Sequence, residues 1–540
     1  MKNIEKTIQG SAIWAAYGDI LGFITELTDS DGVKRRTGQD KVYAPLKWQR
    51  LIGGRYGTKI NLLAGTYSDD TQLRLSTARA IYSNGSFDVE AFAKVELPVW
   101  LSYSLGAGRG TKAAANSLRH QGVNWFSNFF DKDGSSYLNC GGNGAAMRIQ
   151  PHVWVSRERG IPESYIVDVI KNSICTHGHT RGIVGAIFHA MCLAHTIFKM
   201  EIPGPKEWHE ILDYIPITVD LIKKDNELSN FWLPVWEDRA GIKLKDAFIH
   251  VQEECVKDIE VAIKLCEVKS EKNYVDLVSK LGAMSDKYKG SGTKTSIIAA
   301  ILSWMHRDSD PSEAMFVASN LIGSDTDTIA TMAGAMLGAV SDSFPSGEIL
   351  DKEYILADAS RLAKISQGVR CDNYNYPDLI SWDPPKTQLD SLGRVDDEYF
   401  VSGLGKAKPV GEQYEGRSKG TIWEWIKLDI GQTLLIKRRP ELKPTTGRSL
   451  PMHKVAPDNK SAYKKMEYSA QTDLFDKKEK NIHELTSEAI RLNFDPQIIG
   501  RHILEIVERP QGIELAVAYV AIIGKAKIAR SEAQQRNSKT

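Results

Sequence analysis

Two short stretches combine carboxylates with hydroxyl groups, and each lies directly before an apolar segment. Tyr67–Gln72 reads Tyr-Ser-Asp-Asp-Thr-Gln, and Gly323–Thr328 reads Gly-Ser-Asp-Thr-Asp-Thr. A Ser or Asp before a helix is commonly its N-cap, and acidic residues favour the positive end of a helix, so capping alone explains the first stretch equally well. The second stretch exceeds what one cap requires, because it holds two acids with two hydroxyl neighbours.

The second stretch has the ligand types of a divalent-cation site. Asp325 and Asp327 are two residues apart and can point to the same side in an extended or turn segment, with Thr328 adding an oxygen. Mg²⁺ prefers oxygen ligands of this kind, with water completing its shell. If the two acidic stretches converge, they could hold two ions close together, an arrangement that stabilises attacking and leaving oxygens in one reaction.

Further segments carry chemistry-bearing residues with weaker signals. Glu26 follows Gly18-Asp19-Ile-Leu-Gly22 near the expected end of the first long helix, where a solvated glutamate is the simpler interpretation.

The glycine-rich segment Asn139–Arg148 runs into an expected helix, and its amides could cradle a diphosphate. Gly106–Lys112 superficially resembles a nucleotide loop, but its threonine precedes its lysine, which argues against a kinase or NTPase.

A histidine pair lies in Cys175–Gly182, as His177-Gly-His179. No further cysteine or histidine has the spacing of a zinc site, so zinc is disfavoured. A histidine that contacts substrate, or one that organises a loop, is the better hypothesis.

The elements that must position these residues are helices. From Ile4 to about Ser366 apolar residues recur at helical spacing, and the segments between them are rich in Gly, Asp, Asn and Ser. The segment after Thr328 is unusually rich in alanine and glycine, which favours close helix contact and a central position. The clearest predicted helices are Ile13–Leu21, Leu73–Tyr82, Val89–Tyr103, Ile183–Phe198, Phe248–Cys266, Ile297–Met305, Ala314–Leu321 and Ile329–Val340.

The character of the chain changes after Cys371. Short strand-like runs, Glu398–Val410, Thr421–Leu428 and Thr433–Lys437, are separated by glycines, and helical patterning returns in Ile482–Ser531, notably in Ile499–Val507 and Ile513–Ile528. The predicted fold is therefore all-α with a smaller C-terminal α+β accessory region. Its predicted parts are a catalytic domain over 1–368, a linker over 369–395, a strand-containing unit over 396–440, a polar flexible segment over 441–480 and a helical piece over 481–540.

Composition places the chain among ordinary globular proteins. Of its 540 residues 42% are hydrophobic and 25% charged, and the formal net charge is +1, so no overall field attracts nucleic acid or membrane. Six cysteines form no C-x-x-C pair and are expected to be free thiols in a reducing compartment. The N-terminus has no basic-then-apolar signal pattern, and no stretch was expected to span a bilayer, so we expect a cytoplasmic protein.

The ordered motifs together resemble the ADP-ribosylglycohydrolase family, the group related to the dinitrogenase-reductase-activating glycohydrolase. The resemblance covers roughly residues 5 to 365. It rests on five motifs: Gly18-Asp19-x-x-Gly22-x-x-x-Glu26, Ser68-Asp69-Asp70-Thr71, Gly142-Asn143-Gly144-x-x-Met147-Arg148, Thr176-His177 and Gly323-x-Asp325-x-Asp327-Thr328-x-Ala330.

The resemblance implies an all-α fold whose cleft binds two Mg²⁺ ions, or Mn²⁺ in their place, and receives ADP-ribose. It assigns metal ligation to Ser68, Asp69, Asp70, Asp325, Asp327 and Thr328. Glu26 would take the position of an acidic residue that, in this family, lies near the metals and the scissile bond. It places Gly141, Gly142, Asn143 and Gly144 along the diphosphate, with His177, Gly106 and Gly108 shaping the pocket. Ser68 stands where many relatives carry threonine, and either hydroxyl can ligate a metal.

The implied reaction is hydrolysis at C1″ of the distal ribose, which releases ADP-ribose from an acceptor. Glu26 or Asp70 would assist as the base, and Asp69 with Asp70 would offset positive charge on the sugar. The alternatives are a sensor that binds ADP-ribose without cleaving it and a metal-dependent hydrolase of another nucleotide. The expected partner is an ADP-ribosylated acceptor. Nucleic acid is a second candidate through Trp423, Trp425 and the basic residues up to Arg439, although a core-facing strand with a solvated basic rim explains that segment more simply.

Overall fold

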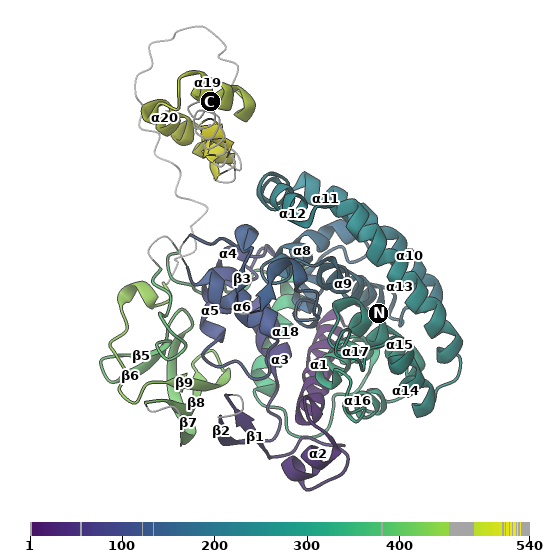
Figure 1. Ribbon diagram of the computed structural model, residues 1–540. Coiled ribbons are helices and arrows are strands. Elements are labelled where there is room, and N and C mark those ends of the chain that lie inside the picture. The colour runs from purple at the N-terminus through teal and green to yellow at the C-terminus, as the bar shows by residue number, and fades with distance from the viewer. Residues whose placement is uncertain are drawn as a thin grey trace. The chain divides into compact units, whose positions relative to one another are not determined.

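The computed structural model describes most of the chain (Figure 1). The described residues are 3–452, except 54–56, 121, 133, 380–381 and 418–419, and then 480–509 with separate positions from 512 to 530. Contacts divide the chain into two units. The first joins Met1–Val219 to Ile242–His453, and the second joins Asp220–Gly241 to Lys454–Thr540. Every predicted site residue lies in the first unit.

The first unit is built around α1 (Ile4–Thr25), which has almost no exposed face. From Thr7 to Thr25 only Gln9 is not fully buried. A helix that is apolar on all sides belongs in the interior of a domain. Glu26 ends α1 as its C-cap, and the amide of Glu26 donates to the carbonyl of Gly22.

The close partner of α1 is α17 (Thr326–Val340), which packs against it backbone to backbone. A Cβ added at Gly18 would lie 2.4 Å from the carbonyl oxygen of Ala330, and one added at Gly338 would lie 2.3 Å from that of Gly10. Only glycine permits such an approach. The predicted small-residue helix is therefore the central partner of α1, and the pairing joins residues more than 300 positions apart in the chain.

The other helices surround this pair and confirm the predicted all-α architecture. Those of the catalytic region are α2 (Ser30–Thr37), α3 (Asp69–Arg79), α4 (Val89–Ala91), α5 (Leu97–Trp100), α6 (Arg109–Leu118), α7 (Gln150–Val155), α8 (Ile166–Ile174), α9 (Thr180–Lys199), α10 (Pro205–Tyr214), α13 (Leu244–Cys266), α14 (Glu271–Lys280), α15 (Gly292–Met305), α16 (Pro311–Ser319) and α18 (Lys352–Ser366). A π-helical turn over Phe92–Glu96 joins α4 to α5. Each of the eight predicted helices overlaps at least one of these elements or α1 or α17.

Two short antiparallel strand pairs in the helical half were not predicted. The strands β1 (Trp48–Ile52) and β2 (Thr58–Leu62) form one pair, and the two-residue strands β3 (Asp131–Lys132) and β4 (Ser135–Ser136) form the other. In β1 only the two end residues are buried, because the strand lies at the surface. Such a strand has too few apolar positions to show the alternation that reveals a strand in sequence.

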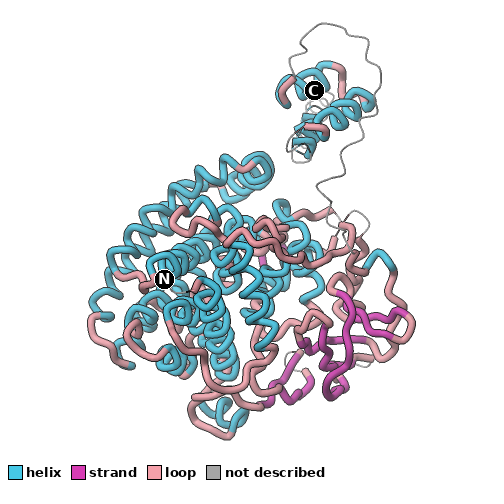
Figure 2. Tube along the Cα trace, turned by 180° about the vertical axis from the view of Figure 1, so that it is seen from behind, coloured by secondary structure: helices cyan, strands magenta, loops and turns pink. Residues whose placement is uncertain are grey.

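A five-stranded antiparallel meander follows the helices in the same unit (Figure 2). Its strands pair in chain order: β5 (Leu392–Val395), β6 (Glu398–Val401), β7 (Gly405–Glu415), β8 (Ile422–Leu428) and β9 (Thr433–Arg438). The three predicted strand runs overlap β6 to β9, whereas β5 was not predicted. The sheet is held to the helices by polar contacts: Trp382 Nε1 donates to the carbonyl of Lys94, and the Lys437 amide to that of Ser102.

Helix α9 corrects the expectation that no segment could span a bilayer. It is long and apolar enough to cross a membrane by length and composition, yet 78% of its most apolar window is buried inside the protein. A Cβ added at Gly185 of α9 would lie 2.3 Å from the carbonyl of Gly292 in α15. Its apolar composition is therefore that of a core helix.

The second unit contains the C-terminal helices α19 (Ile482–Arg491) and α20 (Pro496–Val507), and α12 (Leu233–Ala240), while α11 (Thr218–Lys224) begins in the first unit. Asn481 caps α19 in a capping box with Glu484. The C-terminal helices share a small core made of Leu485, Ala489, Phe494, Ile506, Ala516, Tyr519 and Ile523. Residues 453–479 of the predicted flexible segment, and much of the predicted helix over 513–528, lie outside the described residues.

Candidate functional site

The first acidic stretch is fixed by Asp19, a fully buried residue of α1. Its two carboxylate oxygens accept hydrogen bonds from the backbone amides of Ser68 and Thr71, each at 2.9 Å. These are amides at the start of α3, which has no intrahelical partners for them. Ser68 is the N-cap, and its hydroxyl accepts from the Asp70 amide at 3.2 Å.

Asp69 is held by the loop that follows α5. Its amide donates to the carbonyl of Leu105 at 2.7 Å, and its Oδ1 accepts from the amide of Ala107 at 2.7 Å. Gly106 lies between them at φ +88°, and a Cβ there would meet Asp69 Oδ1 at 2.5 Å. Gly106 is therefore required by its backbone conformation and by the closeness of the carboxylate.

The second acidic stretch starts α17 and meets the first. Thr328 Oγ1 lies 3.4 Å from Asp70 Oδ1, a long hydrogen bond that joins the two stretches across 258 positions. Asp325 is the N-cap of α17, yet its side chain makes no capping bond, and its Oδ2 accepts from Asn143 Nδ2 at 3.0 Å. The predicted convergence of the two stretches is present in the fold.

Glu26 lines the same cavity. Its carboxylate pairs with Arg50 of β1, with Nη2 and Oε2 3.2 Å apart, and the guanidinium of Arg50 stacks on Phe23. Burial raises the pKa of Glu26, Arg50 lowers it, and the nearby Asp325 raises it again. Glu26 is thus a restrained, half-buried carboxyl group rather than a free helix end.

Uncompensated negative charge is the main electrostatic feature of this region. Burial, with a contribution from Glu26, raises the pKa of Asp69 to about 7. Burial and the neighbouring carboxylates raise the pKa of Asp70 and of Asp327 well above their ordinary value. Arg74 is a buried cation close to Asp70 and Asp19, and burial lowers its own pKa to about 10. A bound cation would relieve this repulsion.

The donor set fits hard divalent cations. All the candidate ligands offer oxygen, and Asp70 Oδ2 is buried without a hydrogen-bond partner in the described part of the chain. No three acidic, cysteine or histidine side chains among the described residues already form a single ready-made metal cage. The carboxylates therefore surround the cavity, and hydroxyls, water or substrate oxygens would have to supply the remaining ligands.

The opposite wall is made of backbone amides and His177. The Asn143 amide donates to the carbonyl of Gly290 at 2.8 Å, which fixes the predicted glycine-rich loop. His177 Nδ1 lies 2.7 Å from the Thr176 hydroxyl, which also accepts from Arg148 Nη2 at 2.8 Å. The Thr176 hydroxyl also lies 3.4 Å from the carbonyl of Ser173, so Arg148, Thr176 and Ser173 together fix the orientation of the His177 ring.

His177 is neutral in this setting. Burial and, to a smaller extent, Arg148 lower its pKa to about 3. The ring packs under the glycine loop, since a Cβ at Gly144 would lie 3.0 Å from its Cε1. His177 therefore offers a hydrogen-bonding edge to the cavity without adding charge.

A cavity of about 610 Å³ unites these walls. The predicted residues that line it are Glu26, Asp69, Asp70, Gly108, Gly141, Gly142, Asn143, Gly144, His177, Asp325, Asp327 and Thr328. Two predicted residues are absent from its lining. Ser68 is fully buried behind Asp70, where it caps α3, and Gly106 supports Asp69 from the side.

Several residues of the site were not assigned from sequence. Asp19 belongs to a quoted motif, but its role in holding the start of α3 needs the fold. Arg50, Asp286, Lys289 and Gly290 come from segments without a recognisable motif, and the last three belong to the loop before α15. The only sequence signal in that loop was Gly290-Ser-Gly292.

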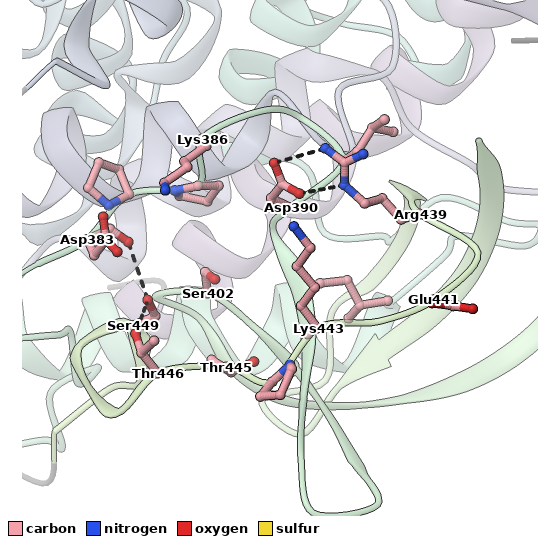
Figure 3. Close-up of a pocket in the computed structure, with 16 residues that line it drawn as sticks. Asp383, Lys386, Asp390, Ser402, Arg439, Glu441, Lys443, Thr445, Thr446 and Ser449 are labelled. Atoms are coloured by element: carbon pink, nitrogen blue, oxygen red, sulfur yellow. Dashed lines mark hydrogen bonds and ion pairs between the residues drawn. The ribbon is translucent and has the colours of Figure 1, made fainter. Parts of the chain in front are cut away.

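A second cavity of about 200 Å³ lies beside the sheet (Figure 3). Lys386, Arg439 and Lys443 line it, and so do Asp383, Asp390 and Glu441. Arg439 is paired with Asp390 at 2.7 Å. Its three cations are thus matched by three carboxylates, so this cavity has no excess charge to select an ion, and it contains no predicted site residue.

The aromatic residues considered for nucleic-acid stacking are part of the sheet interior. Trp423 is 7% exposed and Trp425 is 2% exposed. Stacking on these rings is therefore not available from the surface. Lys437 packs over the ring of Trp423. Nucleic-acid binding remains a prediction that the basic rim alone would have to support.

Comparisons with known proteins find distant relatives of this chain. A protein of Escherichia coli strain K12 named YegU, whose function is uncharacterized, is 24% identical over 347 residues, or 62% of this chain and 87% of that protein. The ADP-ribosylhydrolase ARH3 of Xenopus tropicalis is 25% identical over 353 residues, or 61% of this chain and 86% of that protein. An uncharacterized protein of Archaeoglobus fulgidus is 22% identical over 376 residues, or 67% and 97%.

A solved structure titled "ADP-ribosylglycohydrolase-related protein complex" aligns at a TM-score of 0.44 and 17% identity, covering 68% of this chain and 100% of that one. The sequence model of the ADP-ribosylglycohydrolase family matches residues 2–370, which include both acidic stretches, the glycine loop and His177. The chain belongs to the ADP-ribosylglycohydrolase family.

Proposed function

We propose that the protein hydrolyses the bond at C1″ of the distal ribose in ADP-ribosylated acceptors, with two Mg²⁺ or Mn²⁺ ions held by the acidic stretches. The observation that carries the proposal is the convergence of Asp70 and Thr328 on one cavity that also receives the glycine loop. Family membership supports glycohydrolase activity in general. The metal requirement and the choice of acceptor are part of the proposal.

Asp69, Asp70, Asp325, Asp327 and Thr328 would hold the ions, and Ser68 would act through its cap on α3 rather than as a direct ligand. When bound, the ions would orient ribose hydroxyls and make a water molecule more acidic. Burial and, to a smaller extent, the neighbouring carboxylates raise the pKa values of Asp69 and Asp70, and a bound cation would keep these groups ionised at neutral pH.

The remaining groups would bind and orient the substrate. The Gly141–Gly144 loop and the start of α6 line the cavity, and the first-turn amides of α6 would suit a diphosphate. His177 would make a hydrogen bond to the substrate through Nε2. Glu26 or Asp70 would take the proton of the attacking water, while nearby carboxylates offset positive charge on the sugar ring.

The test is a panel of ADP-ribosylated acceptors, including arginine, serine and nucleic-acid conjugates, incubated with and without EDTA. We expect release of ADP-ribose from at least one acceptor, loss of release in EDTA and recovery on addition of Mg²⁺ or Mn²⁺. Release that is unaffected by EDTA would contradict the metal requirement. Calorimetric binding of ADP-ribose without release from any acceptor would identify a sensor instead.

Asp325→Ala should reduce release by on the order of a thousandfold, because several kcal/mol of transition-state stabilisation depend on the ions. Its fold should persist, since Asp325 makes no capping bond. Asp308→Ala, which removes a carboxylate that is 85% exposed at another surface, is the matched control. Release by Asp325→Ala at the wild-type rate would refute the ligand assignment.

A further inference from the structure

The start of β9 is linked through Asp351 to Tyr67, the residue immediately before Ser68 of the first acidic stretch. The Thr433 amide donates to Asp351 Oδ2, and the Thr433 hydroxyl donates to Asp351 Oδ1, both at 2.7 Å. The same Oδ2 accepts from the hydroxyl of Tyr67 at 2.9 Å. Tyr67 is 2% exposed and directly precedes Ser68. One carboxylate therefore connects the accessory sheet to the chain that carries Asp69 and Asp70.

Gln432 extends this connection to the other end of α3. Its Oε1 accepts from Arg79 Nη1 at 2.6 Å, and its Nε2 lies 3.5 Å from the Tyr67 hydroxyl. Arg79 is the last residue of α3, and it also makes two bonds to Glu96, at 2.8 and 2.7 Å. Gln432 has no exposed surface. The consecutive residues Gln432 and Thr433 are thus connected to both ends of α3. Gln432 bonds to Arg79 at its end, and Thr433 is linked through Asp351 to Tyr67, just before its start.

A third contact reaches the loop that holds Asp69. The amide of Lys437, also in β9, donates to the carbonyl of Ser102 at 2.8 Å. Three residues beyond Ser102, the carbonyl of Leu105 accepts from the Asp69 amide, and the Ala107 amide donates to the Asp69 side chain. The sheet therefore supports both chain segments that define the position of Asp69.

These contacts are buried, specific and polar, which suits them to fixing positions. Asp351 has its backbone at φ +59°, a conformation that a non-glycine residue keeps only when its surroundings determine it. Glu96 also accepts from the hydroxyl of Tyr376 at 2.8 Å, so residues after the helical domain contribute on both sides of Arg79. Each of these buried side chains has a hydrogen-bond partner from another segment. A buried network whose hydrogen bonds are satisfied in this way favours one arrangement of its side chains.

We propose that Gln432 and Thr433 are positioning residues for the active site, and that the accessory sheet sets the placement of Asp69 and Asp70 through Tyr67, Asp351 and Arg79. The proposal rests on the proposed function, since it concerns the same acidic stretch. The sheet lies beyond residues 2–370, which the family model matches. It would influence the reaction by positioning Asp69 and Asp70, without contacting the substrate.

The test compares Thr433→Val with Thr421→Val in the full-length chain. Both residues are buried threonines, 8% and 6% exposed, and each lies at the start of a strand: Thr433 begins β9 and Thr421 directly precedes β8. Only Thr433 bonds to Asp351. We expect kcat for ADP-ribose release to fall about tenfold in Thr433→Val, because a small displacement of reacting groups has an effect of this size or larger. KM should change by less than twofold. Thr421→Val should match the wild type, and Thr433→Ser should restore most of kcat.

A second readout does not depend on activity. Hydrogen–deuterium exchange of the amides over Tyr67–Thr71, measured in EDTA, should be faster in Thr433→Val and unchanged in Thr421→Val. If Thr433→Val fails to fold, Tyr67→Phe removes the other donor to Asp351 and should give the same two effects. In the double variant Tyr67→Phe/Thr433→Val, the kcat losses of the two single variants should not multiply if both act through Asp351.

Equal kcat and equal exchange in Thr433→Val and Thr421→Val would overturn the proposal. So would a loss in Thr433→Val that appears only in KM. If the wild-type protein releases no ADP-ribose from any acceptor, the proposed function fails, whereas the exchange experiment still decides whether the sheet holds Tyr67–Thr71.

Discussion

The two acidic stretches have similar sequences but are positioned by different forces. Polar groups hold the first stretch: Asp19 accepts from two of its amides, and the loop after α5 binds Asp69 on both its backbone and its side chain. Backbone packing places the second, since a Cβ at Gly22 would lie 2.3 Å from the Cα of Asp327. Hydrogen bonds thus fix the carboxylates of the first stretch, and close backbone contact fixes those of the second.

The difference indicates which substitutions each side should tolerate. A stretch held by hydrogen bonds should be sensitive to a change of charge or donor at constant volume. A stretch held by packing should be sensitive to added volume at constant chemistry, because interiors have no room for an extra carbon. Four changes, taken from the largest expected effect to the smallest, separate these two cases.

Gly22→Ala should have the largest effect, on the packed side. The new methyl group would meet the backbone of Thr326 and Asp327 at 2.3 to 2.4 Å, so α17 must shift. We expect a loss of about 3 kcal/mol in unfolding free energy and, in the folded fraction, a loss of about a hundredfold in kcat. Urea unfolding and steady-state kinetics measure both. Gly500→Ala, at a helical glycine with open space around it, is the control.

Asp19→Asn should be next, on the hydrogen-bonded side. The volume is unchanged, but one acceptor oxygen becomes an amide group that faces the amide of Ser68 or Thr71. We expect kcat to fall about tenfold or more, as for the loss of one charged hydrogen bond. Gln9→Glu, a change of the same size on the same helix far from the acidic stretches, serves as its control. Wild-type kcat in Asp19→Asn would show that packing positions this stretch too.

The pH dependence of the unfolding free energy should reveal the ionisation of Asp69 in the first acidic stretch. The pKa of Asp69 rises from an ordinary 3.8 to about 7 in the folded protein. The unfolded chain therefore releases this proton first, and the metal-free protein should lose stability as the pH rises from about 4 to about 7. Asp69→Asn should remove that part of the slope. Urea unfolding in EDTA between pH 4 and 8 measures it, and identical slopes for both proteins would contradict the assignment.

Ser68→Ala should have the smallest effect. The Ser68 hydroxyl caps α3 and is buried away from the cavity, so its loss should destabilise the protein by about 1 kcal/mol and change kcat by less than about threefold. Thermal unfolding and kinetics with Mg²⁺ test this. A hundredfold weaker response to Mg²⁺ would instead establish Ser68 as a ligand, as the family resemblance implied.

Much of this arrangement could be predicted from the sequence, because periodicity and motifs report local structure. The helix over 326–340 and its small residues were recognised, and so were Asp70 and Asp325 as members of one site. Asp19 was quoted within a motif without a role, since its partners are amides about 50 positions away. The loop with Lys289 and Gly290, and the contacts of Thr433, involve residues with no local pattern. Such contacts arise from the assembled fold.

Helix α1 has a consequence for biosynthesis. It is almost wholly buried and is made well before its partner α17, which begins about 300 residues later, with Thr25 and Thr326 in contact across 301 positions. At translation rates of roughly 5 to 20 residues per second, the nascent helix waits some 15 to 60 seconds before α17 leaves the ribosome. During that interval its apolar surface needs shielding by chaperones or by transient neighbours. No fragment that ends before α17 can assemble the acidic site.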